Sequence, residues 1–194
     1  MTGIMLKSVL LTAILLNDFF SEAPKGWIKA GSDPSKFEAG VVQDPVKKDN
    51  KVAYLKSVSD TVNGFGTLMQ QFKADRYKGK RLKMTGRVRS QVLSDWAGLW
   101  LRIDQSNSST PLAFDNMSSR PIKGSTGWTS YEIVLDVPGN SATIAFGILM
   151  AGTGELWLDD IAFSIVGNKV ATTVQVTSSK GNELPVQPVN LSFD

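Results

Sequence analysis

Residues 157–163 read Trp-Leu-Asp-Asp-Ile-Ala-Phe, an apolar run interrupted by two adjacent aspartates. A second run near the start of the sequence, residues 16–20, reads Leu-Asn-Asp-Phe-Phe and is followed by Gly26 and Trp27. Adjacent acids are a poor choice for an ordinary buried strand, because a carboxylate taken out of water must be paired, hydrogen-bonded or bound to a cation. We therefore expect both runs to be strands of one domain that lie side by side and bring their acids together.

Further strand signals fill the region between these two runs, and turn residues separate them. The expected strands are residues 14–20, 27–30, 37–42, 51–57, 66–74, 81–90, 98–104, 111–114, 129–137, 143–150 and 155–165. The sequence shows no convincing helical periodicity. Many short strands at regular spacing are typical of a sandwich, so the predicted fold class is all-β, with two packed sheets.

The composition removes several classes of chemistry. The 194 residues include no cysteine and no histidine. A disulfide framework, thiolate catalysis, a Ser-His-Asp triad and any His- or Cys-ligated metal site are therefore excluded. The formal net charge is only +3 and the basic residues are scattered, which argues against a nucleic-acid partner. These exclusions favour binding over catalysis.

The sequence divides into residues 1–13 as a leader or signal-like segment, residues 14–166 as the domain, and residues 167–194 as a flexible tail. Lys7 and the apolar residues 9–16 resemble the core of a signal peptide, but this run is shorter than the ~20 residues that span a bilayer. The alternative, which we favour, is that residues 14–20 are a buried strand. That alternative favours a cytoplasmic over a secreted protein, and the sequence does not decide the compartment.

The first and last runs resemble the opening and closing strands of the galactose-binding-like jelly rolls, the fold of many carbohydrate-binding modules. The middle of the sequence is similar to one bacterial branch of this superfamily, which occurs as stand-alone proteins and beside AraC-type transcription regulators. The segments that carry this similarity are residues 30–34, 64–70, 79–81, 96–100, 113–117 and 120–122. The resemblance covers residues 15–166 and implies a two-sheet jelly roll.

The function that this resemblance implies is noncatalytic binding of a carbohydrate or another polyhydroxylated ligand. An alternative of another class is an accessory domain for protein interaction or effector sensing, in which the same face meets a partner chain. A third, a carboxylate glycoside hydrolase, would need an acid and a base or nucleophile among Asp104, Asp115 and Glu132. Nearby arginines would keep these carboxylates ionised, which argues against the raised pKa that a general acid needs.

Strand alternation indicates the candidate ligand contacts. In the strand expected at residues 98–104, Trp100, Arg102 and Asp104 share the face opposite the apolar one. Binding pockets combine an apolar platform with a few placed polar groups, so Trp100 is the expected platform. The expected ligand-binding residues are Trp96, Trp100, Arg102, Asp115, Asn116 and Arg120. The remaining tryptophans are assigned to packing, and they are Trp27, Trp128 and Trp157.

In many sugar-binding jelly rolls the acid of the closing strand helps to bind a structural Ca²⁺, which takes about six to eight oxygen ligands. The resemblance assigns this role to Asp160, with Asp18 and Glu22 as partners from the opening segment. The opening acid is displaced here, because Ser21 separates Phe20 from Glu22. The alternative is that Asp160 bonds backbone N–H groups or an arginine without any cation.

The tail is rich in Thr, Ser, Val, Gln and Pro and has no sustained pattern, so it reads as a linker. It ends in Asn-Leu-Ser-Phe-Asp, residues 190–194, which resembles the strand that opens domains of this type. Two interpretations are open: a frayed terminus, or an edge strand that Leu191 and Phe193 add to the same or a neighbouring molecule. The second interpretation predicts self-association, which deletion of residues 182–194 would test.

Overall fold

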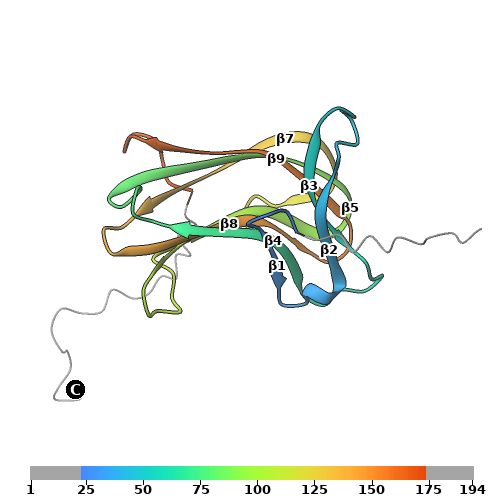
Figure 1. Cartoon of the computed structure of the whole chain (residues 1–194), viewed down its shortest axis with the longest axis horizontal. Coiled ribbons are helices and arrows are strands. Elements are labelled where there is room, and N and C mark those ends of the chain that lie inside the picture. Colours follow the sequence, from blue (N-terminus) through green and yellow to red (C-terminus); the bar gives the residue numbers. More distant parts are fainter. Residues whose placement is uncertain (1–22, 174–194) are drawn as a thin grey trace, which may run out of the picture.

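The computed structural model describes residues 23–173, which fold into nine β-strands and one short 3₁₀ helix (Figure 1). These elements are β1 (Ile28–Gly31), η1 (Pro34–Lys36), β2 (Phe37–Gln43), β3 (Lys51–Ser57), β4 (Phe65–Lys73), β5 (Lys80–Gln105), β6 (Ala113–Asp115), β7 (Ile122–Val137), β8 (Ser141–Ala151) and β9 (Glu155–Val166). The predicted all-β class is confirmed. Within residues 23–173, no helix is long and apolar enough to cross a membrane. The strand expected at residues 14–20 and the terminal one at Leu191 and Phe193 lie outside the described residues.

The strand β5 is 26 residues long and belongs to both layers of the sandwich. Its first half pairs with β7 and β9, and Lys80 lies opposite Val137 of β7. Its second half pairs with β8 and β6, and Trp100 lies opposite Gly147 of β8. We call the layer β1-β4-β8-β5-β6 the front sheet and the layer β2-β3-β9-β5-β7 the back sheet. Figure 1 shows the two layers stacked on each other.

The two strands expected at residues 81–90 and 98–104 are the two ends of β5, so the interruption predicted between them was wrong. The backbone stays in the strand there, but its pairing with β7 shifts register three times between Val88 and Ala97. Val92 in this stretch has a φ of 50°, in the left-handed region that β-branched residues rarely occupy. Irregularities of this kind bend a strand, which lets β5 pass from the back sheet to the front sheet.

The main core lies between the two sheets and follows the predicted alternation. Six inward side chains of β5 are at most 1% exposed, and they are Leu82, Met84, Val88, Leu99, Leu101 and Ile103. The front-sheet strand β8 adds Ile144, Phe146, Ile148 and Met150 to the same cluster. Full burial of such a side chain stabilises the fold by about 1.5–3 kcal/mol. Since these residues point inward, their neighbours in the front sheet point to its outer face.

Asp159 and Asp160, the adjacent acids of the closing strand, lie at a β-bulge. In the ladder with β5, Asp159 pairs with Arg87 and Ala162 pairs with Thr85, so two residues of β9 face one residue of β5. Asp160 has a φ of 51°, a conformation that Asp tolerates better than most residues. The extra residue reverses which side of β9 faces the core.

This reversal explains how an apolar strand carries two adjacent acids. The β9 residues that contact the core are Leu156 and Leu158 before the bulge, and Ile161 and Phe163 after it. In an uninterrupted strand one of two successive side chains would point inward. With the bulge, Asp159 is half-buried and Asp160 is exposed, and neither carboxylate enters the core.

The back sheet curls until its two edges meet. Trp128 of β7 donates from Nε1 to Oδ1 of Asp44, just after β2, at 3.2 Å, although three strands lie between them in the sheet. Val52, Tyr54 and Trp157 form a second apolar cluster inside this curl, and Trp128 packs against it. The prediction that Trp128 and Trp157 serve packing is confirmed.

The start of the expected tail lies against the back sheet. Arg81 Nη1 donates to the carbonyl oxygens of Asn168 and Val170 at 3.0 and 2.6 Å. The backbone N–H of Thr173 donates to the carbonyl oxygen of Val134 in β7 at 2.9 Å. The chain is therefore held to the sandwich as far as residue 173.

Candidate functional site

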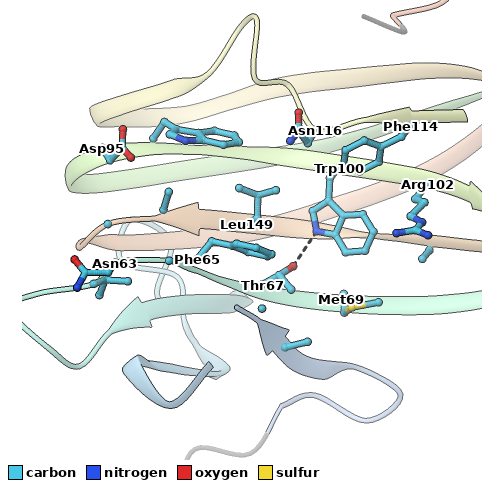
Figure 2. A pocket seen from close by; sticks show the side chains of 18 of the residues that line it. Asn63, Phe65, Thr67, Met69, Asp95, Trp100, Arg102, Phe114, Asn116 and Leu149 are labelled. Carbon is cyan, nitrogen blue, oxygen red and sulfur yellow. Dashed lines mark hydrogen bonds between the residues drawn. The ribbon is translucent and has the colours of Figure 1, made fainter. Parts of the chain in front are cut away.

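A groove of about 1050 Å³ lies on the outer face of the front sheet (Figure 2). Its floor comes from the middle strands and consists of Thr67 and Met69 of β4, Ala145 and Leu149 of β8, and Trp100 of β5. These positions alternate with the residues that build the core, so the same pattern that buries one face supplies the other.

Trp100 lies in the floor of the groove and is 8% exposed. Its Nε1 donates to Oγ1 of Thr67 at 2.8 Å, and Thr67 Oγ1 donates in turn to the carbonyl oxygen of Ile148 at 2.7 Å. The indole reaches from β5 across β8 to β4 because Gly147, opposite Trp100, has no side chain. A Cβ at position 147 would also collide with the carbonyl oxygen of Leu68. The residue expected as an open platform is a hydrogen-bonded part of the floor.

Two phenylalanines that the sequence interpretation did not single out stand beside this floor. Phe65 of β4 is 39% exposed and Phe114 of β6 is 40% exposed, and both line the groove. Figure 2 shows them on opposite sides, with Leu149 and Trp100 between them. Phe114 lies opposite Arg102 in the ladder between β6 and β5, which sets its ring on the outer face. The one sequence signal for Phe65 is the glycine on each side of it.

Arg102 stands at one end of the groove and is held by its own neighbours. Its Nε donates to Oδ1 of Asp104 at 2.8 Å, and its Nη2 donates to the carbonyl oxygen of Ser109 at 3.0 Å. The Asp104 side chain is 19% exposed and Arg102 is 37% exposed, so the pair is partly shielded from water. This pairing fixes the guanidinium and leaves Nη1 without a partner among residues 23–173.

Further polar side chains line the rim, among them Gln71 of β4. Asn116 accepts the backbone N–H of Ser118 on its Oδ1 at 3.1 Å, which points its Nδ2 away from that contact. Asn63 and Asp95 lie at the end of the groove opposite Arg102 (Figure 2). The rim thus presents amide groups and a carboxylate around an apolar floor.

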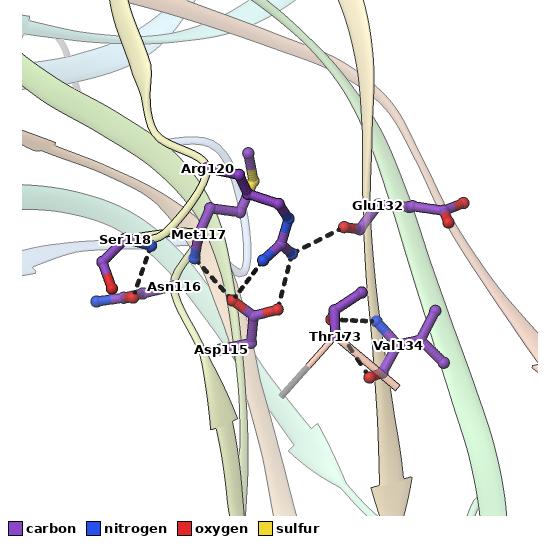
Figure 3. Close-up of polar contacts among 8 residues, drawn as sticks. All are labelled: Asp115, Asn116, Met117, Ser118, Arg120, Glu132, Val134 and Thr173. Atoms are coloured by element: carbon purple, nitrogen blue, oxygen red, sulfur yellow. Dashed lines mark hydrogen bonds and ion pairs between the residues drawn. The ribbon is translucent and has the colours of Figure 1, made fainter. Parts of the chain in front are cut away.

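Asp115 and Arg120, which the sequence interpretation placed among the ligand contacts, do not line the groove. The Asp115 side chain is fully buried, and its Oδ2 lies 2.7 Å from Nη2 of Arg120 (Figure 3). Its Oδ1 accepts the backbone N–H of Met117 at 2.8 Å, and Arg120 Nη2 also donates to the carbonyl oxygen of Glu132 at 3.1 Å. This cluster fastens the segment after β6 to β7. The groove brings together Trp96, Trp100, Arg102 and Asn116 from the expected set.

The three carboxylates considered for hydrolysis do not share a pocket in the described part of the chain. Asp104 lies at the groove beside Arg102. Asp115 is enclosed with Arg120, and Glu132 pairs with Lys83 at 3.5 Å on the back sheet. An acid and a base that act on one glycosidic bond must lie on either side of it, within roughly 5–10 Å of each other. This arrangement gives no such pair.

Asp160, the expected calcium ligand, is 63% exposed and lies 3.4 Å from Nη1 of Arg87. Its neighbour Asp159 accepts a hydrogen bond from Nδ2 of Asn50 at 2.8 Å. Within residues 23–173, no group of three acids could hold a metal ion. Among these residues the charged partner of the Asp160 carboxylate is the Arg87 guanidinium. Asp18 and Glu22 lie outside the described residues, and their part in a calcium site stays a prediction.

No family model matches the sequence. The chain is 43% identical over 177 residues to the uncharacterized HTH-type transcriptional regulator YbfP of Bacillus subtilis (strain 168). This similarity covers 91% of the chain and 59% of the relative, so the chain spans about three fifths of the curated relative it matches. The link to transcription regulators expected from the sequence agrees with this relative.

Solved structures show the same arrangement of strands. The CBM22-1–GH10 modules of Clostridium thermocellum endo-1,4-β-D-xylanase 10B, complexed with xylohexaose, match with a TM-score of 0.54 at 14% identity, over 76% of this chain and 28% of that one. A xylan-binding domain of CBM22 matches with a TM-score of 0.51 at 11% identity, over 78% of this chain and 94% of that one. This chain has the jelly-roll fold of the carbohydrate-binding modules.

The carbohydrate-binding-module fold also serves in enzymes. The enzymatically active domain of bacteriophage CBA120 tailspike protein 4 matches this chain with a TM-score of 0.52 at 11% identity, over 73% of this chain and 20% of that one. Function therefore depends on the residues of the groove rather than on the fold.

Proposed function

We propose that the chain binds a carbohydrate in the groove of the front sheet and does not cleave it. The observation that carries this proposal is the pair of exposed rings, Phe65 and Phe114, on either side of an outward groove. Aromatic rings accept the C–H faces of sugars, while a few polar groups orient the hydroxyls. The fold that the chain shares with xylan-binding domains supports the same role.

The residues of the groove have separate roles in this proposal. Phe65, Phe114 and the partly buried Trp96 supply contact area for sugar rings. Asn63 and Asp95 at one end, together with Asn116, Arg102 and Gln71, form hydrogen bonds to hydroxyls. Trp100 supports the floor and holds β4 to β5 through Thr67. The separation of the three candidate carboxylates, each of which is paired with a cation, supports binding without cleavage.

The similarity to an HTH-type regulator favours a second candidate function, in which the domain senses an effector for transcription control. The two functions differ in the size of the ligand. A sensor responds to a free monosaccharide or disaccharide, whereas a module that targets polymers needs several sugar units in the groove. Titration with glucose, xylose, cellobiose and xylobiose beside xylohexaose distinguishes them.

Affinity electrophoresis in gels that contain xylan, mixed-linkage β-glucan or glucomannan tests the main proposal. We expect at least one polymer to retard the full chain, and Phe65→Ala and Phe114→Ala each to weaken retention by about tenfold, because both rings are exposed contact surface. Val41→Ala, at a half-exposed residue of β2 in the back sheet, is the matched control and should leave retention unchanged. If both phenylalanine variants bind like the wild type, the groove is not the binding site.

A further inference from the structure

We infer that the groove selects carbohydrates that carry O-acetyl groups over the same carbohydrates without them. This inference rests on the proposed function, because it concerns the ligand of the same groove. It follows from two observations: the polar groups of the floor are bonded to the protein itself, and donors left unbonded among residues 23–173 stand at the rim.

The floor of the groove offers a bound sugar no hydrogen bond. Met69, Ala145 and Leu149 are apolar side chains. The two polar groups of the floor are already engaged, because Trp100 Nε1 donates to Thr67 and the Thr67 hydroxyl donates to a backbone carbonyl oxygen. Thr67 is also only 4% exposed, so a ligand cannot approach its oxygen freely. A hydroxyl pressed against this floor would lose its water partners and gain none in return.

The exposed rings do not shield the floor from the hydroxyls of a bound sugar. A sugar without acetyl groups avoids burying unpaired hydroxyls when it places a C–H face on a flat aromatic surface. In this groove the exposed rings, Phe65 and Phe114, stand at opposite sides (Figure 2). Between them the surface is formed by Leu149 and by the largely covered Trp100. A sugar that spans the two rings therefore directs substituents onto an apolar floor that offers no free hydrogen-bonding group.

An acetyl ester matches this distribution of groups. It replaces a hydroxyl hydrogen by an acyl group, so the buried end is an apolar methyl and no donor is left unpaired. Its carbonyl oxygen remains an acceptor, and donors stand at the rim. These donors are the amide nitrogens of Asn63, Gln71 and Asn116 and the Nη1 of Arg102. The methyl group contacts the apolar floor, and the carbonyl oxygen accepts a hydrogen bond from a donor at the rim.

The test compares matched polymers. The full chain is run in gels that contain acetylated xylan or acetylated glucomannan, and in gels of the same samples after mild alkali, which removes the esters and leaves the backbone. We expect deacetylation to weaken binding by about tenfold or more. Equal or stronger retention by the deacetylated samples overturns the inference and leaves the proposed function standing. No retention by either form of either polymer contradicts the proposed function as well.

A pair of variants assigns the selectivity to the floor. Met69 is partly exposed, so a side chain of similar length is accommodated there. Met69→Gln places an amide on the floor and should reduce the preference for acetylated polymer to about threefold or less. Met69→Leu keeps the floor apolar and should keep the preference. If Met69→Gln, shown to be folded by its thermal transition, discriminates like the wild type, the floor is not the source of selectivity.

Discussion

The Asp115 side chain has no exposed surface, and both of its oxygens are bound by the protein itself. Arg120, Asn116 and Asp115 stand close together in the sequence, and all three have side chains suited to sugar hydroxyls. Nothing local in the sequence says that two of them pair with each other while the third lines the groove. The structure separates them because a buried carboxylate needs a partner, and Arg120 supplies a charge and two hydrogen bonds.

Replacement of Arg120 tests this structural role. Arg120→Ala leaves the buried Asp115 carboxylate without its cation, so we expect the free energy of unfolding to fall by about 2–3 kcal/mol, a value reduced because Arg120 is itself 35% exposed. Urea unfolding measures this change, and Arg76→Ala, at an exposed arginine, is the control. A variant with unchanged stability and no carbohydrate binding would instead make Arg120 a ligand contact.

At the scale of elements, local pattern and long-range pairing contribute differently. Alternation in the sequence predicts which residues in the second half of β5 face the core, because strand side chains have a fixed period of two. It does not predict that β5 continues through residues 91–97, since that stretch contains no periodic signal and is shaped by its partners. It also does not predict the bulge at Asp160, although two adjacent acids in an apolar run are the visible sign of one.

Changes in chain length at Asp160 test the bulge. Without this residue Leu158 and Ile161 are two positions apart, so deletion of Asp160 leaves Ile161 and Phe163 facing the core in a regular ladder and should cost less than about 1 kcal/mol of stability. Insertion of one glycine after Asp160 either turns Ile161 and Phe163 away from the core or places the Asp160 carboxylate in it, so we expect it to cost about 3–5 kcal/mol. Urea unfolding of both variants gives the comparison. Equal stability of the two variants contradicts the proposed role of the bulge.

The hydrogen bonds to Asp44, where the two edges of the back sheet meet, make the stability of the fold depend on pH. Burial raises the pKa of the Asp44 carboxyl, but hydrogen bonds from the Val46 and Lys47 backbones and from the Trp128 and Asn50 side chains outweigh this and lower that pKa below its ordinary value. The ionised carboxylate therefore stabilises the fold above its unfolded-state pKa of about 3.9. This stabilisation is lost as the pH falls through the lowered pKa of the folded state.

We expect Asp44→Asn to lower the free energy of unfolding at neutral pH and to lose less of it on acidification than the wild type. The reason is that the variant has no carboxylate to protonate at this position. Urea unfolding at neutral pH and at about pH 3 measures the difference. Asp60→Asn, at an exposed acid, is the control. If acid weakens the Asp44→Asn variant and the wild type equally, Asp44 does not provide this stabilisation.

At the scale of the whole molecule, the sequence predicts the class of the fold and one strand of the groove. Trp100 and Arg102 lie where alternation placed them, on the outer face of β5. Phe65 and Phe114 could not be predicted, because they come from β4 and β6 and meet the same groove only through pairing across the sheet. The extent to which Trp100 is covered also depends on a distant partner, Thr67, and on the absence of a side chain at Gly147.

The five tryptophans of the chain give the most direct test of the claim that the front-sheet groove binds carbohydrate. Each indole N–H gives one signal in a ¹⁵N correlation spectrum of the labelled full chain, assigned through single Trp→Phe variants. On titration with xylohexaose, and separately with cellohexaose, the account predicts that the signals of Trp96 and Trp100 shift while those of Trp128 and Trp157 in the back sheet stay in place. Shifts at Trp128 and Trp157 without shifts at Trp96 and Trp100, or no shift with either oligosaccharide, would contradict it.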